Sequence, residues 1–160
     1  MIILITGPIN AGKTTVGKIL QERIPRTALL ERFRQPIQWM SIEESIPLNI
    51  ANMVGSAKIF LRHGLNLVIA YPVSLQELRR IEAELSEFGQ DIQTFVLAPR
   101  LEVATTDRGG RPLQPWEVER IKEQYAEGYH RPGYGQVIDN SEQTPEETAK
   151  VILEAVGFTG

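Results

Sequence analysis

The chain has 160 residues, 42% of them hydrophobic and 23% charged, which is enough for one globular domain with its own core. Its 17 basic and 20 acidic side chains give a formal net charge of −3, so the charge indicates neither a nucleic acid nor an anionic membrane surface as a partner. The absence of cysteine excludes disulfides and thiolate metal sites, and two histidines are too few to suggest a histidine metal site.

The N-terminus and the apolar runs bear on the protein's location. The first residues lack a basic leader with a cleavage site, and no apolar run approaches the roughly 18 residues that a membrane span requires. We therefore expect a soluble cytoplasmic protein. No repeat, low-complexity tract or linker interrupts the chain, so residues 1–160 are predicted to form a single domain of unknown oligomeric state.

Five apolar segments alternate with segments of helical periodicity along the chain. The predicted strands are residues 1–6, 27–33, 65–71, 91–98 and 136–139. The predicted helices cover residues 16–24, 50–61, 75–88, 115–127 and 145–156. Ser74 with Glu77 and Thr144 with Glu147 have the spacing of capping boxes at two of the helix starts. This alternation predicts an α/β fold in which helices cover both faces of a parallel sheet.

The segment GPINAGKT, residues 7–14, lies between the first predicted strand and the first predicted helix. It has the pattern GxxxxGK(S/T) of a phosphate-binding loop, the Walker A motif. In such a loop the glycines let the backbone curl until successive N–H groups point at an anion, at a helix start whose dipole favours negative charge. Lys13 would contact the β and γ phosphates and is also a predicted catalytic residue, and Thr14 would offer its hydroxyl to Mg²⁺ as the predicted metal ligand. The predicted nucleotide-binding residues of the loop are Gly7, Asn10, Ala11, Gly12, Lys13, Thr14 and Thr15.

Two classes of protein with such a loop lack support elsewhere in the sequence. A GTPase should carry DxxG after an early strand and NKxD for guanine, but DRGG (residues 107–110) follows the fourth predicted strand and NKxD is absent. An ATP-hydrolysing motor should carry an acidic residue at the end of an apolar strand, but the third predicted strand ends in Ala70 and Tyr71. We therefore expect neither a GTPase switch nor a motor.

In length, element order and three motifs the chain resembles the P-loop small-molecule kinases, the group of shikimate kinase, chloramphenicol phosphotransferase and their nucleoside monophosphate kinase relatives. Besides the glycine loop, TDRGGR (residues 106–111) resembles the lid of these kinases, and IDNSEQTPEE (residues 138–147) resembles their adenine-side turn. The resemblance implies the three-layer P-loop NTPase fold, with a five-stranded parallel sheet in the order 2-3-1-4-5, helices on both faces, and a lid at about residues 104–115. It also implies ATP as the phosphoryl donor and Mg²⁺ as the metal.

The lid-like segment contains two arginines. Phosphoryl transfer needs positioning, exclusion of water and cations on the transferred group, and arginines in a glycine-containing loop suit that need. We predict that Arg108 and Arg111 are catalytic and that Arg108 also contacts the nucleotide; the alternative is that both are simply solvated. The resemblance further implies that Asn140 and Ser141 lie beside the nucleotide.

The second predicted strand departs from the pattern of the family. Members usually end this strand with one or two aspartates, whereas LLERFRQP (residues 29–36) offers Glu31 alone. Glu31 is the predicted catalytic carboxylate, as a general base or as an anchor for Mg²⁺ through water, and pairing with a neighbouring arginine is an equally open alternative. Arg34 resembles an arginine that grips the acceptor, and Trp39 lies where an aromatic ring would cover it, so both are predicted substrate-binding residues.

Two functions remain after these observations. The first is ATP-dependent phosphotransfer to a small-molecule acceptor, which is a metabolite, a nucleotide or an antibiotic, and the expected partners are then ATP and that acceptor. The second is a catalytically weakened ATP-binding module that uses lid closure as a signal, which the missing carboxylate after the third strand favours. The retained lysine and threonine of the loop and the two lid arginines favour the first. The acceptor depends on a pocket that no spacing in the sequence describes.

Overall fold

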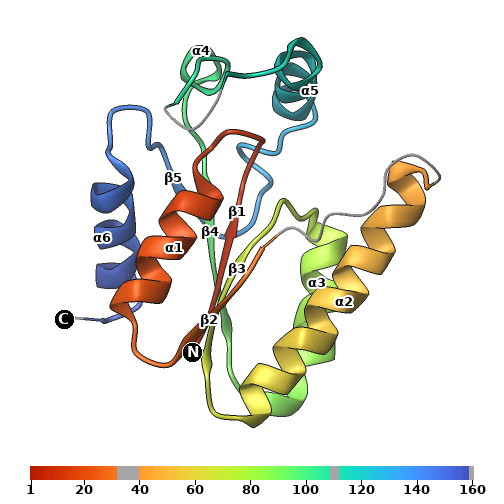
Figure 1. Ribbon diagram of the computed structural model, residues 1–160, viewed down its shortest axis with the longest axis vertical. Helices are drawn as coiled ribbons and strands as arrows, with labels where there is room; N and C mark the ends of the chain where they lie inside the picture. Colours follow the sequence, from red (N-terminus) through yellow and green to blue (C-terminus); the bar gives the residue numbers. More distant parts are fainter. Residues whose placement is uncertain (32–39, 109–111, 159–160) are drawn as a thin grey trace.

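Five parallel strands form one sheet at the centre of the molecule (Figure 1). The computed structural model describes residues 1–31, 40–108 and 112–158. The strands are β1 (Ile2–Thr6), β2 (Thr27–Leu30), β3 (Asn66–Ala70), β4 (Ile92–Leu97) and β5 (Gln136–Ile138). Their order across the sheet is β2-β3-β1-β4-β5, and every pairing is parallel. The predicted α/β class and the predicted strand order are both confirmed.

Helices cover the sheet on both faces. They are α1 (Lys13–Arg23), α2 (Ile42–Arg62), α3 (Leu75–Leu85), α4 (Leu101–Ala104), α5 (Pro115–Ala126) and α6 (Pro145–Ala155), with a 3-10 turn η1 (Ser86–Phe88) after α3. The helices α1 and α6 pack on one face and α2 and α3 on the other, while α4 and α5 lie beyond the carboxyl ends of the strands (Figure 1). Within the described ranges, no helix has both the length and the apolarity that crossing a bilayer requires.

The central strand β1 supplies side chains to two separate cores. Ile2 and Leu4 pack toward α2 and α3, whereas Ile3 and Ile5 pack toward α1 and α6, as the period of two in a strand requires. All four side chains are fully buried. Burial on both faces explains why the first strand is a continuous apolar run rather than an alternating one.

Some predicted boundaries differ from those of the structure. The second predicted helix began at residue 50, but α2 begins at Ile42, after a capping box in which Ser41 and Glu44 exchange hydrogen bonds. Pro47 within α2 obscured this earlier start, because proline usually ends or kinks a helix. The strand β2 ends at Leu30, directly before Glu31, and residues 32 and 33 of the predicted strand lie outside the described residues. The four-residue helix α4 was not predicted.

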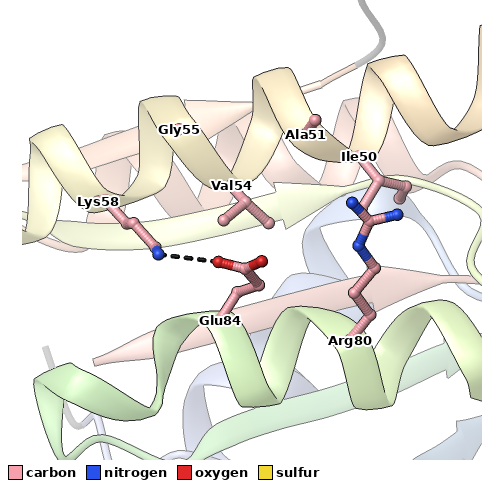
Figure 2. A pocket seen from close by; sticks show the side chains of 7 residues that line it. All are labelled: Ile50, Ala51, Val54, Gly55, Lys58, Arg80 and Glu84. Atoms are coloured by element: carbon pink, nitrogen blue, oxygen red, sulfur yellow. Dashed lines mark hydrogen bonds and ion pairs between the residues drawn. The ribbon is translucent and has the colours of Figure 1, made fainter.

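A small cavity of about 200 Å³ lies between α2 and α3 (Figure 2). Lys58 and Glu84 form an ion pair across it at 2.9 Å, and Arg80 lies further along the same groove. Gly55 borders the cavity in the middle of α2, and a Cβ added there would meet no atom within 4 Å. The space for a larger side chain at this position is therefore already present.

We expect Gly55→Ala to stabilise the protein. Glycine within a helix costs roughly 0.5–1 kcal/mol relative to alanine, so the free energy of unfolding should rise by about that amount in urea or thermal unfolding. The matched control is Gly17→Ala in α1, where the new Cβ would lie 2.9 Å from Leu29 Cδ1 and 3.4 Å from Ala70 Cβ. The gain at position 17 should be smaller or reversed, and an equal gain at both sites would contradict the packing argument.

Candidate nucleotide-binding site

The phosphate loop, residues 7–14, begins where β1 ends at the carboxyl edge of the sheet. Its first residue, Gly7, has a φ of +127°, and a Cβ at this position would lie 2.2 Å from the carbonyl oxygen of Leu97 at the end of β4. No other residue fits both the dihedral angle and the space. Beneath the loop, the buried hydroxyl of Thr6 accepts a hydrogen bond of 3.0 Å from the N–H of Val73, so the loop rests on a fixed base.

The helix that follows the loop begins without a side-chain cap. Gly12 is its N-cap residue, with a φ of +95°, and within the described part of the chain the structure has no side-chain cap at this helix start. Ser41, Ser74 and Thr144, by contrast, cap α2, α3 and α6. The first N–H groups of a helix have no acceptor within it, so those of α1 remain directed outward at the positive end of the helix dipole. This arrangement is suited to an anion.

Lys13 adds a positive charge to the same position. Its Nζ donates to the carbonyl oxygens of Gly7 at 3.0 Å and Pro8 at 2.6 Å. The residue retains some exposure to solvent, but its ammonium lies among loop atoms, and burial lowers the pKa of Lys13 to about 7. Carbonyl oxygens carry only partial charge, so a polyanion would be a better partner for this ammonium.

Two threonines follow Lys13 in the first turn of α1. The side chains of Thr14 and Thr15 are exposed at the mouth of the loop. Oxygen ligands are those that Mg²⁺ prefers, and it commonly keeps waters and phosphate oxygens in its shell. The unsatisfied amides, the ammonium and the Thr14 hydroxyl therefore fit a metal-bound nucleoside triphosphate. Ala11, also predicted to bind nucleotide, is fully buried, so it can contribute its backbone.

The predicted adenine-side residues lie against the loop. Asn140 is 3% exposed, and its Nδ2 donates to the carbonyl oxygen of Ala11 at 3.0 Å. Its Oδ1 is buried and has no hydrogen-bond donor within the part of the chain that the structure describes. The guanidinium of Arg108 donates to the carbonyl oxygens of Asn140 at 3.2 Å and Asn10 at 3.4 Å. Three segments far apart in the sequence thus meet around the first turn of α1.

Ser141 organises the turn that follows β5. Its hydroxyl accepts from the N–H of Arg100 at 2.8 Å and donates to Asp139 Oδ1 at 2.5 Å. These contacts with Ser141 lower the pKa of Asp139. Ser141 therefore links the turn after β5, the predicted adenine-side turn, to the segment that precedes α4.

Two polar side chains have partners that the sequence did not reveal. The amide of Asn10 donates to the carbonyl oxygens of Ala104 at 2.8 Å and Thr106 at 2.9 Å, so only its backbone N–H could donate to an anion in the loop. Gln124 of α5 is 5% exposed, and its Oε1 accepts from the N–H of Ile9 at 2.7 Å. The helical pattern of residues 115–127 gave no sign that this glutamine reaches the loop.

The acceptor side of the site is described in part. Glu31 directly follows β2 and is exposed. Tyr71 directly follows β3, and its hydroxyl accepts from Asn49 Nδ2 at 3.4 Å, so a phenol and not a carboxylate follows this strand. The predicted residues Arg34, Trp39 and Arg111 lie outside the described residues.

Comparison with known proteins establishes the fold. No family model and no curated protein matches the chain. Solved structures match nearly all of it. The tunicamycin resistance protein of Deinococcus radiodurans is 24% identical over 99% of this chain and 96% of that one, with a TM-score of 0.72. A sugar kinase from a Janibacter species is 15% identical over 98% and 94%, with a TM-score of 0.72. The APS kinase of Mycobacterium tuberculosis, solved with AMPPNP and APS, is 15% identical over 97% and 96%, with a TM-score of 0.63. The fold is that of the P-loop kinases.

Proposed function

We propose that this protein is an ATP-dependent phosphotransferase that acts on a small-molecule acceptor. The observation that carries the proposal is the uncapped start of α1, with the Lys13 ammonium held at the loop carbonyls beside it. A capped helix with a solvated lysine would be the expected arrangement if the loop were only a turn. The fold shared with P-loop kinases supports the same conclusion.

Residues of the loop, the predicted lid and the adenine-side turn have separate roles in the proposed phosphoryl transfer. Bound ATP with Mg²⁺ supplies the phosphoryl group. The backbone amides at the start of α1 and the Lys13 ammonium bind the phosphates, and the Thr14 hydroxyl holds the metal. Arg108 and Arg111, both from the predicted lid, place positive charge on the transferred group and exclude water. Asn140 and Ser141 position the nucleoside on the other side.

On the acceptor side, Glu31 is the proposed base for the attacking hydroxyl. It follows β2 at the carboxyl edge of the sheet, where parallel α/β proteins bind their ligands. Arg34 and Trp39 would hold the acceptor. The acceptor is a metabolite, a nucleotide or an antibiotic, and the likeness to a tunicamycin resistance protein makes tunicamycin one of the compounds to test.

A second function is favoured by one observation, the phenol of Tyr71 after β3 where a carboxylate would be expected. Because Glu31 is the carboxylate proposed for both roles, proton transfer and metal anchoring compete for the same group. In this case the protein binds ATP without efficient turnover, and closure of the predicted lid, at about residues 104–115, is its signal.

Steady ADP formation with Mg²⁺ and ATP over a panel of acceptors separates the two functions. The phosphotransferase should show acceptor-dependent turnover, and Glu31→Gln should lower kcat by roughly 10²–10⁴-fold while the Kd for ATP stays within about twofold. Glu22→Gln, at an exposed position on α1, is the control and should keep full activity. Tight ATP binding with no turnover on any acceptor would instead identify the binding module.

A further inference from the structure

Asn10 makes three contacts with one short segment, which we call the arginine segment (residues 104–108). Its Nδ2 donates to the carbonyl oxygens of Ala104 at 2.8 Å and Thr106 at 2.9 Å. Its own carbonyl oxygen accepts from the Arg108 guanidinium at 3.4 Å. Both protons of the amide are therefore used, and all the partners lie between the end of α4 and Arg108.

The backbone at this position explains why asparagine is suited to it. Asn10 has a φ of +62°, a left-handed conformation that residues with a Cβ rarely adopt and that asparagine and aspartate tolerate best. This conformation belongs to the curl of the phosphate loop. The orientation of the Asn10 amide toward the arginine segment is therefore tied to the loop's curled shape.

A second contact fixes the neighbouring residue. The N–H of Ile9 donates to the buried Oε1 of Gln124 on α5, at 2.7 Å. The outer edge of the loop is thus held by α5 at residue 9 and by the arginine segment at residue 10. Neither contact uses the N–H groups at the start of α1, which remain available to phosphate.

We propose that the Asn10 side chain couples the shape of the phosphate loop to the position of Arg108. The inference rests on the proposed nucleotide-binding function. When the loop is curled to receive phosphate, the Asn10 amide holds the carbonyls of residues 104 and 106, and this places Arg108 beside the loop. When the amide link is absent, the loop and the arginine segment move independently. Asn10 is then a positioning residue, and its effect is transmitted through Arg108.

The test is a double-mutant cycle on the Kd for AMPPNP with Mg²⁺, measured by calorimetry for the full chain. Asn10→Gly removes the amide and keeps the left-handed backbone free of strain. We expect Asn10→Gly and Arg108→Ala each to weaken binding by about tenfold. Asn10→Gly leaves the contacts of Arg108 with the carbonyl oxygens of Asn140 and residue 10 in place. If Arg108 nevertheless acts from the position that the Asn10 amide fixes, Arg108→Ala should weaken binding by less than about twofold in the Asn10→Gly background. Two independent effects that multiply to about a hundredfold would overturn the coupling.

Two further variants keep the result specific. Asn10→Asp has the shape of asparagine and tolerates the same φ, but its carboxylate cannot donate to two carbonyls, so it should bind at least as weakly as Asn10→Gly. An Asn10→Asp protein with wild-type affinity would overturn the role of the amide donor. Arg120→Ala, on α5, removes a half-buried guanidinium paired with Glu123 and Glu127 and should change the Kd by less than about twofold in either background. Failure of the wild-type protein to bind AMPPNP would overturn the nucleotide-binding function itself, and with it this inference.

Discussion

Lys13→Met should remove nucleotide binding while leaving the fold intact. The ammonium lies at the start of α1 and has two carbonyl oxygens as its partners in the free protein. Charge-assisted hydrogen bonds are worth about 1.5–3 kcal/mol each, so losing contacts with two phosphates should weaken the Kd for ATP by about 100-fold or more. Calorimetry measures this change. Folding should not suffer, because methionine replaces a charge that is costly to bury.

The control for this prediction lies on the same helix. Lys18 is exposed on α1, five residues beyond Lys13. Lys18→Met removes the same charge from the surface and should change the Kd by less than about twofold. If both variants lost affinity equally, general attraction of ATP by the protein's charge would account for binding, and the assignment of Lys13 would be wrong.

The pKa of Lys13 also predicts how binding depends on pH. Burial lowers this pKa to about 7 in the free protein, whereas a bound polyphosphate favours the ammonium and raises the pKa again. Below pH 7 the lysine is already protonated, and binding should take up no proton at this site. At about pH 8.5 binding should take up close to one proton, and affinity should fall by roughly tenfold per pH unit above about 7. Calorimetry in buffers of different ionisation enthalpy counts these protons. A flat pH profile from about 6 to 9 would contradict a lowered pKa.

Features that depend on neighbouring residues could be predicted from the sequence. The glycines of the loop, the strand before it and the helix after it lie within one short segment, and their spacing alone predicted a phosphate-binding loop between that strand and that helix. The capping boxes at Ser74 and Thr144 are also local, and the structure contains both. The strand order was predicted from the resemblance to P-loop kinases, and the structure confirms it. Such a prediction is possible because the fold class permits few arrangements of alternating strands and helices.

Contacts between distant segments could not be predicted in this way. The hydrogen bond between Asn10 and Ala104 joins residues 94 positions apart, and that between Ile9 and Gln124 joins residues 115 positions apart. The side chains that make these contacts, those of Asn10 and Gln124, lie in a loop and on a helix, where polar side chains are common. Periodicity reports which face of an element is apolar, but it does not report which polar side chain meets a given backbone group.

Gly7→Ala should disrupt the site more severely than the same substitution at Gly12, the other glycine of the loop. The added Cβ would lie 2.2 Å from the carbonyl oxygen of Leu97, which belongs to the backbone of β4 and cannot rotate away. The backbone of an alanine would also be strained at a φ of +127°. Relief requires the loop to separate from the end of β4, so the free energy of unfolding should fall by more than about 2 kcal/mol and ATP binding should be lost.

Gly12→Ala introduces backbone strain without a steric clash. Its φ of +95° is also left-handed, but the nearest atom to a new Cβ is Asn140 Nδ2 at 3.8 Å, an ordinary contact. The free energy of unfolding of this variant should fall only by the strain of the dihedral angle, about 1–3 kcal/mol. The variant should still fold and should bind ATP with reduced affinity. Thermal unfolding and calorimetry on both variants rank the two effects. The reverse ranking, with Gly7→Ala the milder change, would mean that the loop is not held against β4, and the bound anion would then have no fixed base beneath it.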